Sequence, residues 1–125
     1  MSIPTDRHYT ADHEWILIDG SHATIGITAH AAEALGDIVY VDLPESGTVV
    51  TAAESCGEIE STKSVSELFS PASGEVVESN ESLDGAPETV NSDPYGEGWL
   101  WKMTVDSVGE LLDAAGYAAL IEAGE

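Results

Sequence analysis

The sequence predicts a mostly β fold in which two strand groups pack as a flattened sandwich or barrel, with helices at the margins. Short β-rich runs separated by turn residues indicate the strands, and an internal repeat indicates the two groups. At 125 residues the chain is long enough to bury a core and fits one domain, 1–125. We expect its core at about 13–105 and a C-terminal helical segment at about 107–123.

The first element is a predicted hairpin. Residues 15–18 and 23–27 are rich in apolar and β-branched side chains, which favour strands. Asp19-Gly20-Ser21 between them is a turn signal. The fold is therefore expected to open with two antiparallel strands.

A short helix near 29–35 is predicted next. Thr28 is a suitable N-cap, and Gly36 suits the left-handed conformation that ends many helices. Residues 37–43 are again β-rich and are closed by Pro44. We expect a strand there, and further strands through the middle of the chain.

The C-terminal part combines a last strand with a helix. Residues 99–105 follow a loop marked by Pro and Gly, at 91–98, and have a strand pattern. Ser107-Val108-Gly109-Glu110 has the spacing of a capping box and precedes Leu111-Leu112. This spacing predicts that the C-terminal helix starts near residue 107.

The internal repeat places one lysine near its centre. Residues 46–55, SGTVVTAAES, match residues 73–82, SGEVVESNES, at six of ten positions. The midpoint of the duplicated stretch is residue 64, within the small polar segment Ser61-Thr62-Lys63-Ser64. Two strand groups related by a pseudo-twofold axis can bury their apolar faces against each other. The connection at the axis, which carries Lys63, then projects as an exposed hairpin.

Lys63 is a candidate site for covalent modification. The chain has two lysines, and the other, Lys102, lies inside the predicted last strand. A lysine amine on a flexible stem can form an amide with a carboxylic cofactor. The small neighbours of Lys63 leave such an arm unobstructed. A solvated surface charge is the alternative interpretation of this residue.

Charge and hydropathy exclude several classes of partner. Three basic residues stand against 24 acidic ones, giving a formal charge of −21. Such a surface repels nucleic acids and anionic membranes and favours protein partners with basic docking surfaces. A salt-rich habitat and a solubility device are alternative reasons for the acidity. No apolar run approaches the length of a membrane span, and the first residues lack the pattern of a targeting signal. We expect a cytoplasmic monomer.

The cysteine and histidines do not indicate a metal site. Cys56 cannot form an intrachain disulfide, and its strand-like surroundings favour a small buried hydrophobic role. The four histidines have no compact ligand spacing with Cys56. We expect no metal. We also find no Ser-His-Asp order and no phosphate-binding glycine loop, so the chain is not expected to be an enzyme.

The lysine segment resembles the lipoylation hairpin of glycine cleavage system H proteins. The hairpin similarity runs from Gly57 to Pro71, GEIESTKSVSELFSP. The resemblance extends over nearly the whole chain, through the segments His13-Glu14-Trp15, Gly26-Ile27-Thr28, Ala34 to Val39, Leu43-Pro44, Ser73 to Val76 and Val90 to Leu100.

This resemblance implies a fold and a site. The implied fold is a barrel-sandwich hybrid of the lipoyl/biotinyl hammerhead type, and the implied cofactor is lipoate in amide linkage to Lys63. Family members are recognised by the lipoylating enzyme through a glutamate and a glycine, whose places are taken here by Glu60 and Gly74. A solvated strand charge and an ordinary turn residue are the alternative interpretations of Glu60 and Gly74.

The resemblance also implies a function, in which the chain catalyses no step alone. The lipoyl arm carries the aminomethyl group of glycine from a pyridoxal-phosphate glycine decarboxylase to a tetrahydrofolate-dependent aminomethyltransferase. Dihydrolipoamide dehydrogenase then reoxidises the arm, and a lipoate ligase or lipoyltransferase attaches it. The thiol-disulfide chemistry belongs to the cofactor, and the protein presents and protects it.

Related proteins hold the loaded arm in a cleft near the HEW segment. We expect Glu14 to accept a charge-assisted hydrogen bond from the aminomethyl ammonium, with Asp12 also lining the cleft. An exposed N-terminal carboxylate is the alternative interpretation of Glu14.

Several other functions are compatible with part of this pattern. A lipoyl domain of a 2-oxo acid dehydrogenase complex would share the repeat and the lysine, but such hairpins usually read Asp-Lys-Ala rather than Thr62-Lys63-Ser64. A biotin carrier would place methionines around the lysine. A lipoate-relay protein and an unmodified interaction module are further alternatives.

Overall fold

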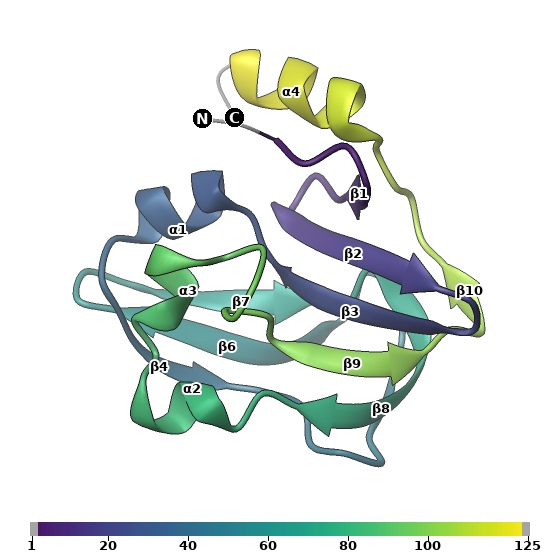
Figure 1. Ribbon diagram of the computed structural model, residues 1–125, viewed down its shortest axis with the longest axis horizontal. Coiled ribbons are helices and arrows are strands. Elements are labelled where there is room, and N and C mark those ends of the chain that lie inside the picture. The colour runs from purple at the N-terminus through teal and green to yellow at the C-terminus, as the bar shows by residue number, and fades with distance from the viewer. Residues whose placement is uncertain (1–2, 124–125) are drawn as a thin grey trace.

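The computed structural model describes residues 3–123 and is built mainly of antiparallel strands, with short helices around them (Figure 1). The elements, in chain order, are β1 (His8–Tyr9), β2 (Glu14–Asp19), β3 (His22–Ile27), α1 (Ala29–Leu35), β4 (Ile38–Asp42), β5 (Val49–Val50), β6 (Ser55–Ser61), β7 (Val65–Phe69), β8 (Ala72–Ser79), α2 (Ser82–Gly85), α3 (Thr89–Ser92), β9 (Trp101–Thr104), β10 (Ser107–Val108) and α4 (Ala114–Glu122).

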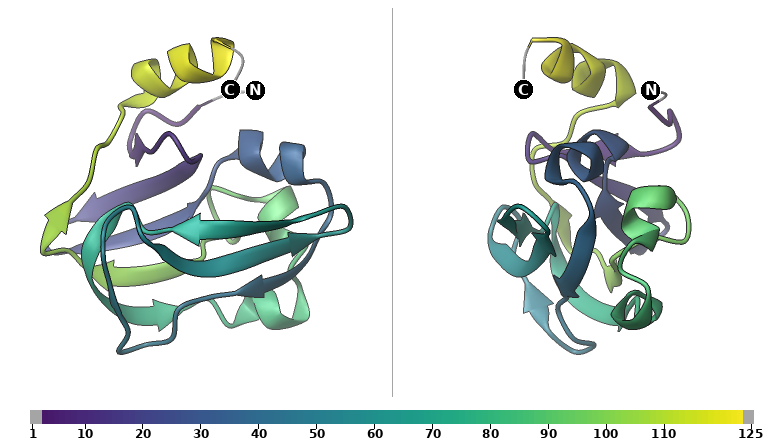
Figure 2. Two further views of the ribbon diagram at one scale, coloured as in Figure 1. Left: turned by 180° about the vertical axis from the view of Figure 1, so that it is seen from behind. Right: turned by 90° about the vertical axis from the view of Figure 1, so that its left-hand side faces the viewer.

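The strands form a larger and a smaller sheet. The larger sheet has the order β1-β2-β3-β9-β8-β10, and β5 also pairs with β8. The smaller sheet has the order β4-β6-β7 and lies across the curled larger sheet (Figure 2). This arrangement confirms the predicted mostly β fold with strand groups packed face to face.

The two copies of the repeat lie side by side. Val49 and Val50 of β5, in the first copy, pair antiparallel with Glu75 and Gly74 of β8, in the second. The chain between the copies forms the β6–β7 hairpin. The repeat therefore marks two neighbouring strands whose connection projects away from them, as the sequence predicts.

The predicted N-terminal hairpin and first helix are confirmed. Gly20, at a φ of 65°, turns β2 into β3. Thr28 caps α1, since its hydroxyl accepts a 3.2 Å hydrogen bond from the Ala31 N–H. Gly36 ends the helix at a φ of 83°, in the region that favours glycine.

The predicted start of the C-terminal helix near residue 107 is wrong. Ser107 and Val108 form β10 and pair with β8, so the capping-box segment is extended. Helix α4 begins six residues later, where the Asp113 carboxylate accepts a 2.7 Å hydrogen bond from the Gly116 N–H. Pairing with Ser73 and Ala72, at the start of β8, satisfies the backbone of 107–108, and Asp113 supplies a cap nearer the apolar run.

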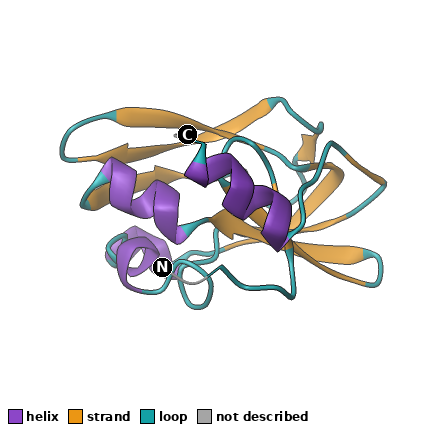
Figure 3. Cartoon of the chain, turned by 90° about the horizontal axis from the view of Figure 1, so that it is seen from above, coloured by secondary structure: helices purple, strands orange, loops and turns teal. Residues whose placement is uncertain are grey.

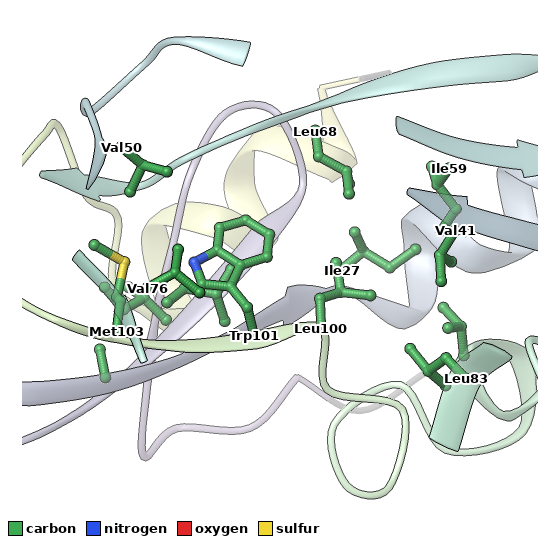
Figure 4. Close-up of a cluster of buried hydrophobic side chains, with 14 of the residues drawn as sticks. Ile27, Val41, Val50, Ile59, Leu68, Val76, Leu83, Leu100, Trp101 and Met103 are labelled. Carbon is green, nitrogen blue, oxygen red and sulfur yellow. The ribbon is translucent and has the colours of Figure 1, made fainter. Parts of the chain in front are cut away.

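The main core fills the space between the two sheets (Figure 4). Trp101 and Met103 of β9 are fully buried, and Leu68 and Ile59 of the smaller sheet are 1% exposed. Burial of this kind stabilises a fold by about 1.5–3 kcal/mol per large apolar side chain. The lysine hairpin is therefore held by the inward-facing residues of β6 and β7.

A second apolar cluster joins the two ends of the described chain. Tyr117 of α4 stacks on Tyr9 with ring centroids 4.8 Å apart. The Tyr117 hydroxyl lies 2.7 Å from the Thr28 hydroxyl and 2.8 Å from His13 Nδ1. Figure 3 looks down on this end, where helices lie in front of the strands. Helix α4 is thus packed over β1 and linked to the cap of α1.

Within residues 3–123, none of the helices combines the length and apolar character needed to cross a membrane.

Candidate functional site

Lys63 lies at the exposed tip of the β6–β7 hairpin, which projects beyond the neighbouring strands (Figures 1 and 2). The turn is closed by a 2.8 Å hydrogen bond from the Ser61 N–H to the Ser64 carbonyl. The buried Ser61 hydroxyl oxygen also accepts from the N–H groups of Lys63 and Ser64, at 3.3 and 3.1 Å. These bonds give the tip a defined backbone shape.

The stem of Lys63 passes over Gly36 at the end of α1. A Cβ atom at position 36 would lie 3.4 Å from Lys63 Cε. The Thr62 N–H donates a 3.0 Å hydrogen bond to the Asp37 carbonyl. The tip therefore rests on the connection between α1 and β4.

The outer face of the smaller sheet is acidic. Asp42, Glu58 and Glu67 are exposed and stand opposite one another in neighbouring strands. Like charges in such positions destabilise a sheet, so this face is not arranged for stability alone. Glu60 is exposed on the same strand as Glu58, nearer the lysine, and is paired with Val65.

Gly74 lies inside β8 and is buried, so its interpretation as a turn residue is wrong. A Cβ atom there would lie 1.9 Å from the Thr104 carbonyl oxygen of β9. The position requires glycine because the two backbones approach too closely for a side chain.

Glu14 is 2% exposed, so its interpretation as an exposed carboxylate is wrong. Its Oε2 accepts a 2.8 Å hydrogen bond from the Phe69 N–H, and its Oε1 accepts a 3.3 Å bond from the Thr10 hydroxyl. Burial raises the pKa of Glu14 to about 8, the two hydrogen bonds oppose this rise, and the charge of Asp12 adds to it. The side chain therefore takes up a proton near neutral pH.

Glu14 and Asp12 line one cleft of about 300 Å³. Asp12 is exposed at its edge, and Glu110, from the segment before α4, lines the same space. Sequence reasoning missed Glu110, because it assigned this residue to a helix and no local pattern connects it with Glu14. The carboxylates of Asp12 and Glu110, joined by Glu14 when it is ionised, favour a cationic group in this cleft.

Cys56 is partly buried against the main core, as its strand-like surroundings predict. Burial, with a contribution from the charge of Glu14, raises the pKa of the Cys56 thiol to about 12. The thiol is therefore protonated and unreactive at neutral pH. In the described part of the chain, no group of three or more His, Cys, Asp or Glu side chains could hold a metal ion.

A β-rich domain that presents a lysine on the tip of a projecting hairpin has the form expected of a carrier domain for a covalently attached arm. The family model described as "Glycine cleavage H-protein" matches residues 7–123. The chain therefore belongs to the glycine cleavage H-protein family, whose role is that of a lipoyl carrier in glycine cleavage.

Individual relatives agree with this assignment. A glycine cleavage system H protein of Beutenbergia cavernae is 66% identical over 120 residues, covering 96% of this chain and 97% of the relative. That of Thermobifida fusca is 56% identical over 123 residues, covering 98% of each. The crystal structure of a glycine cleavage system H protein from Mycobacterium marinum has a TM-score of 0.92 at 53% identity, covering 96% of this chain and 99% of that one.

Proposed function

We propose that residues 1–125 act as one non-catalytic carrier domain, with lipoate attached by an amide bond to Lys63. The exposed position of Lys63 at the hairpin tip, within a family match that spans 7–123, carries this proposal. Ser61, Thr62 and Ser64 are small and leave room for an arm. When bound, lipoate supplies the thiol-disulfide chemistry, and the chain supplies a fixed base for it.

We propose that this carrier works with the following partner enzymes. They are the pyridoxal-phosphate glycine decarboxylase, the aminomethyltransferase, dihydrolipoamide dehydrogenase, and a lipoate ligase or lipoyltransferase. The aligned carboxylates of Asp42, Glu58 and Glu67 suit basic docking surfaces on these enzymes. The cytoplasm is the proposed location, and the monomer the proposed state.

Glu60 and Gly74 have different parts in lipoylation. Glu60 is exposed near the tip and can contact the ligase directly. Gly74, within β8, is buried against β9, so its effect would pass through the shape of the sheet. The proposed recognition therefore combines one charge with one packing requirement.

The cleft of Glu14 and Asp12 is proposed to hold the ammonium of the carried aminomethyl group. An arriving ammonium favours the ionised form of Glu14 and supplies the cation that its buried carboxylate lacks. Phe69, which bonds Glu14, lies at the end of β7 away from Lys63. The loaded arm would therefore lie back along the hairpin.

Intact-mass spectrometry after incubation with a lipoate ligase, lipoate and ATP tests the attachment. We expect a single lipoyl increment on the wild type, no increment on Lys63→Arg, and the full increment on the matched control Lys102→Arg. Lys63→Arg should also abolish glycine cleavage in a reconstituted system. A lipoyl increment that persists in Lys63→Arg, or a biotin increment already present on the purified wild type before incubation, would overturn the proposal.

A further inference from the structure

We infer that Asn91 is a positioning residue for Lys63, because its side-chain amide holds the backbone segment on which the lysine-bearing tip rests. Asn91 follows Lys63 by 28 residues in the sequence and lies in α3. Helix α3 packs beside α1 (Figure 1). The expected effect of Asn91 on modification rests on the proposed lipoylation of Lys63. The support of the hairpin tip by Asn91 does not depend on that proposal.

The Asn91 amide bonds the chain on both sides of Asp37. Its Oδ1 accepts a 2.9 Å hydrogen bond from the Ile38 N–H, and its Nδ2 donates a 2.8 Å bond to the Gly36 carbonyl. The same nitrogen lies 3.5 Å from the Ala32 carbonyl, in the last turn of α1. One planar side chain thus replaces the backbone partner that this connection would have in a sheet.

The segment held in this way contacts the tip at two successive residues. The Asp37 carbonyl, between the two bonds from Asn91, accepts the 3.0 Å hydrogen bond from the Thr62 N–H. Gly36 lies beneath the aliphatic stem of Lys63, with its Cβ position 3.4 Å from Cε. A shift of residues 36–38 would therefore move both the backbone next to Lys63 and the surface that supports its stem.

Asn91 is itself firmly placed. Its neighbour Val90 is fully buried in the main core. Gly98 packs closely against α3, because a Cβ there would lie 2.9 Å from Val90 Cα and 2.8 Å from the Thr89 carbonyl. The core therefore defines the position of Asn91, and Asn91 transmits that position to residues 36–38.

The chain contains a matched control. Its other asparagine, Asn80, is 5% exposed and also bridges backbone groups, with bonds of 2.9 Å to the Glu97 carbonyl and 2.7 Å to the Trp99 carbonyl. These bonds do not touch residues 36–38 or the tip. Asn80→Asp therefore removes comparable hydrogen bonds without disturbing the support of Lys63.

Amide hydrogen exchange, followed by NMR, tests the structural step. Asn91→Asp keeps the shape and the acceptor for Ile38, but places a carboxylate oxygen against the Gly36 carbonyl. We expect the Thr62 amide to exchange at least about tenfold faster in Asn91→Asp than in the wild type. The Ser61 amide, bonded within the turn, and all tip amides of Asn80→Asp should change much less. Unchanged Thr62 exchange, or an equal rise in Asn80→Asp, would overturn the inference.

Lipoylation kinetics test the functional step. Because docking surfaces are intact and only the amine is misplaced, we expect kcat for the ligase to fall about tenfold in Asn91→Asp, with KM changed by less than about twofold. Asn80→Asp should retain the wild-type kcat. If kcat fell in both Asn91→Asp and Asn80→Asp in proportion to the fall in melting temperature, the role of Asn91 would be merely structural and the inference would be overturned.

The two measurements separate this inference from the proposed function. If the wild type takes up no lipoate at Lys63, the proposed function fails, and the exchange of Thr62 still decides whether Asn91 positions the tip. If Asn91→Asp does not fold, the neutral Asn91→Ser replaces it with the same expected results.

Discussion

Oε2 of Glu14, on β2, accepts a 2.8 Å hydrogen bond from the backbone N–H of Phe69, at the end of β7. This bond joins a carboxylate of the larger sheet to the lysine hairpin of the smaller one. The carboxylate is almost fully enclosed, and it borders the cleft proposed for the carried ammonium. The Glu14 side chain is therefore expected to affect the stability of the fold, its pH dependence and the protection of the carried group.

The buried Glu14 should make the protein less stable as pH rises. Between its usual pKa of 4.5 and its folded pKa of about 8, the unfolded chain loses this proton while the folded chain keeps it. The free energy of unfolding should therefore fall across this window, by about 4 kcal/mol from this group, and level off above it. Urea unfolding of the wild type and Glu14→Gln across this window checks the prediction, because the variant should show a smaller decline. Parallel curves for the two proteins would contradict it.

Removal of the Glu14 carboxylate should shorten the life of the carried aminomethyl group. In Glu14→Ala the ammonium loses its charged acceptor, worth about 1.5–3 kcal/mol for a hydrogen bond to a charged group, so release should be about tenfold faster or more. Time-resolved mass spectrometry of the loaded protein measures the loss. Glu33→Ala, on the exposed side of α1, is the control. Equal half-lives in wild type and Glu14→Ala would rule out the protective role.

Glu60 should affect lipoylation more than an exposed carboxylate far from the tip. Glu60→Gln removes one charge near the tip, and we expect kcat/KM for the ligase to fall about tenfold, as for loss of one charge-assisted hydrogen bond. Glu75→Gln, an exposed carboxylate on β8 outside the aligned carboxylates of the smaller sheet, should stay within about twofold. If both variants lost the same activity, the effect would be one of overall charge.

Substitution of Gly74 should destabilise the fold itself. In Gly74→Ala the new methyl group would meet the Thr104 carbonyl at 1.9 Å, so β8 and β9 must separate. We expect a loss of about 1–3 kcal/mol in the free energy of unfolding, the range for overpacking a closed site. Gly85→Ala is the control, since nothing lies within 4 Å of a Cβ there. Thermal unfolding that left Gly74→Ala as stable as Gly85→Ala would contradict the close approach.

Gly36 should be needed both for the end of α1 and for the stem of Lys63. Gly36→Ala forces a non-glycine residue to a φ of 83°, which costs about 1–3 kcal/mol. The added methyl group also contacts Lys63 Cε. Lower stability together with altered ligase kcat is expected. A variant with wild-type stability would show that the backbone relaxes freely at this position.

Local patterns were sufficient where one segment satisfies its own requirements. Thr28 and Gly36 lie at the two ends of α1, and the predicted helix at 29–35 is confirmed because both caps act within a few residues. The repeat predicted a projecting connection at Lys63, because the chain between the two copies, which contains Lys63, belongs to neither strand group. The prediction failed at Ser107, because residues 107–108 pair with the start of β8 instead of following the local capping signal.

The sequence by itself determined the family, the projecting hairpin and the lysine at its tip, since these depend on residue order and local turn chemistry. Only the tertiary structure decided the burial and raised pKa of Glu14, the meeting of Glu14 with Asp12 and Glu110, and the support of the tip by Asn91. The physical reason is that desolvation and hydrogen bonding depend on neighbours distant in sequence. Glu14 and Phe69, 55 residues apart, become partners only when the two sheets pack.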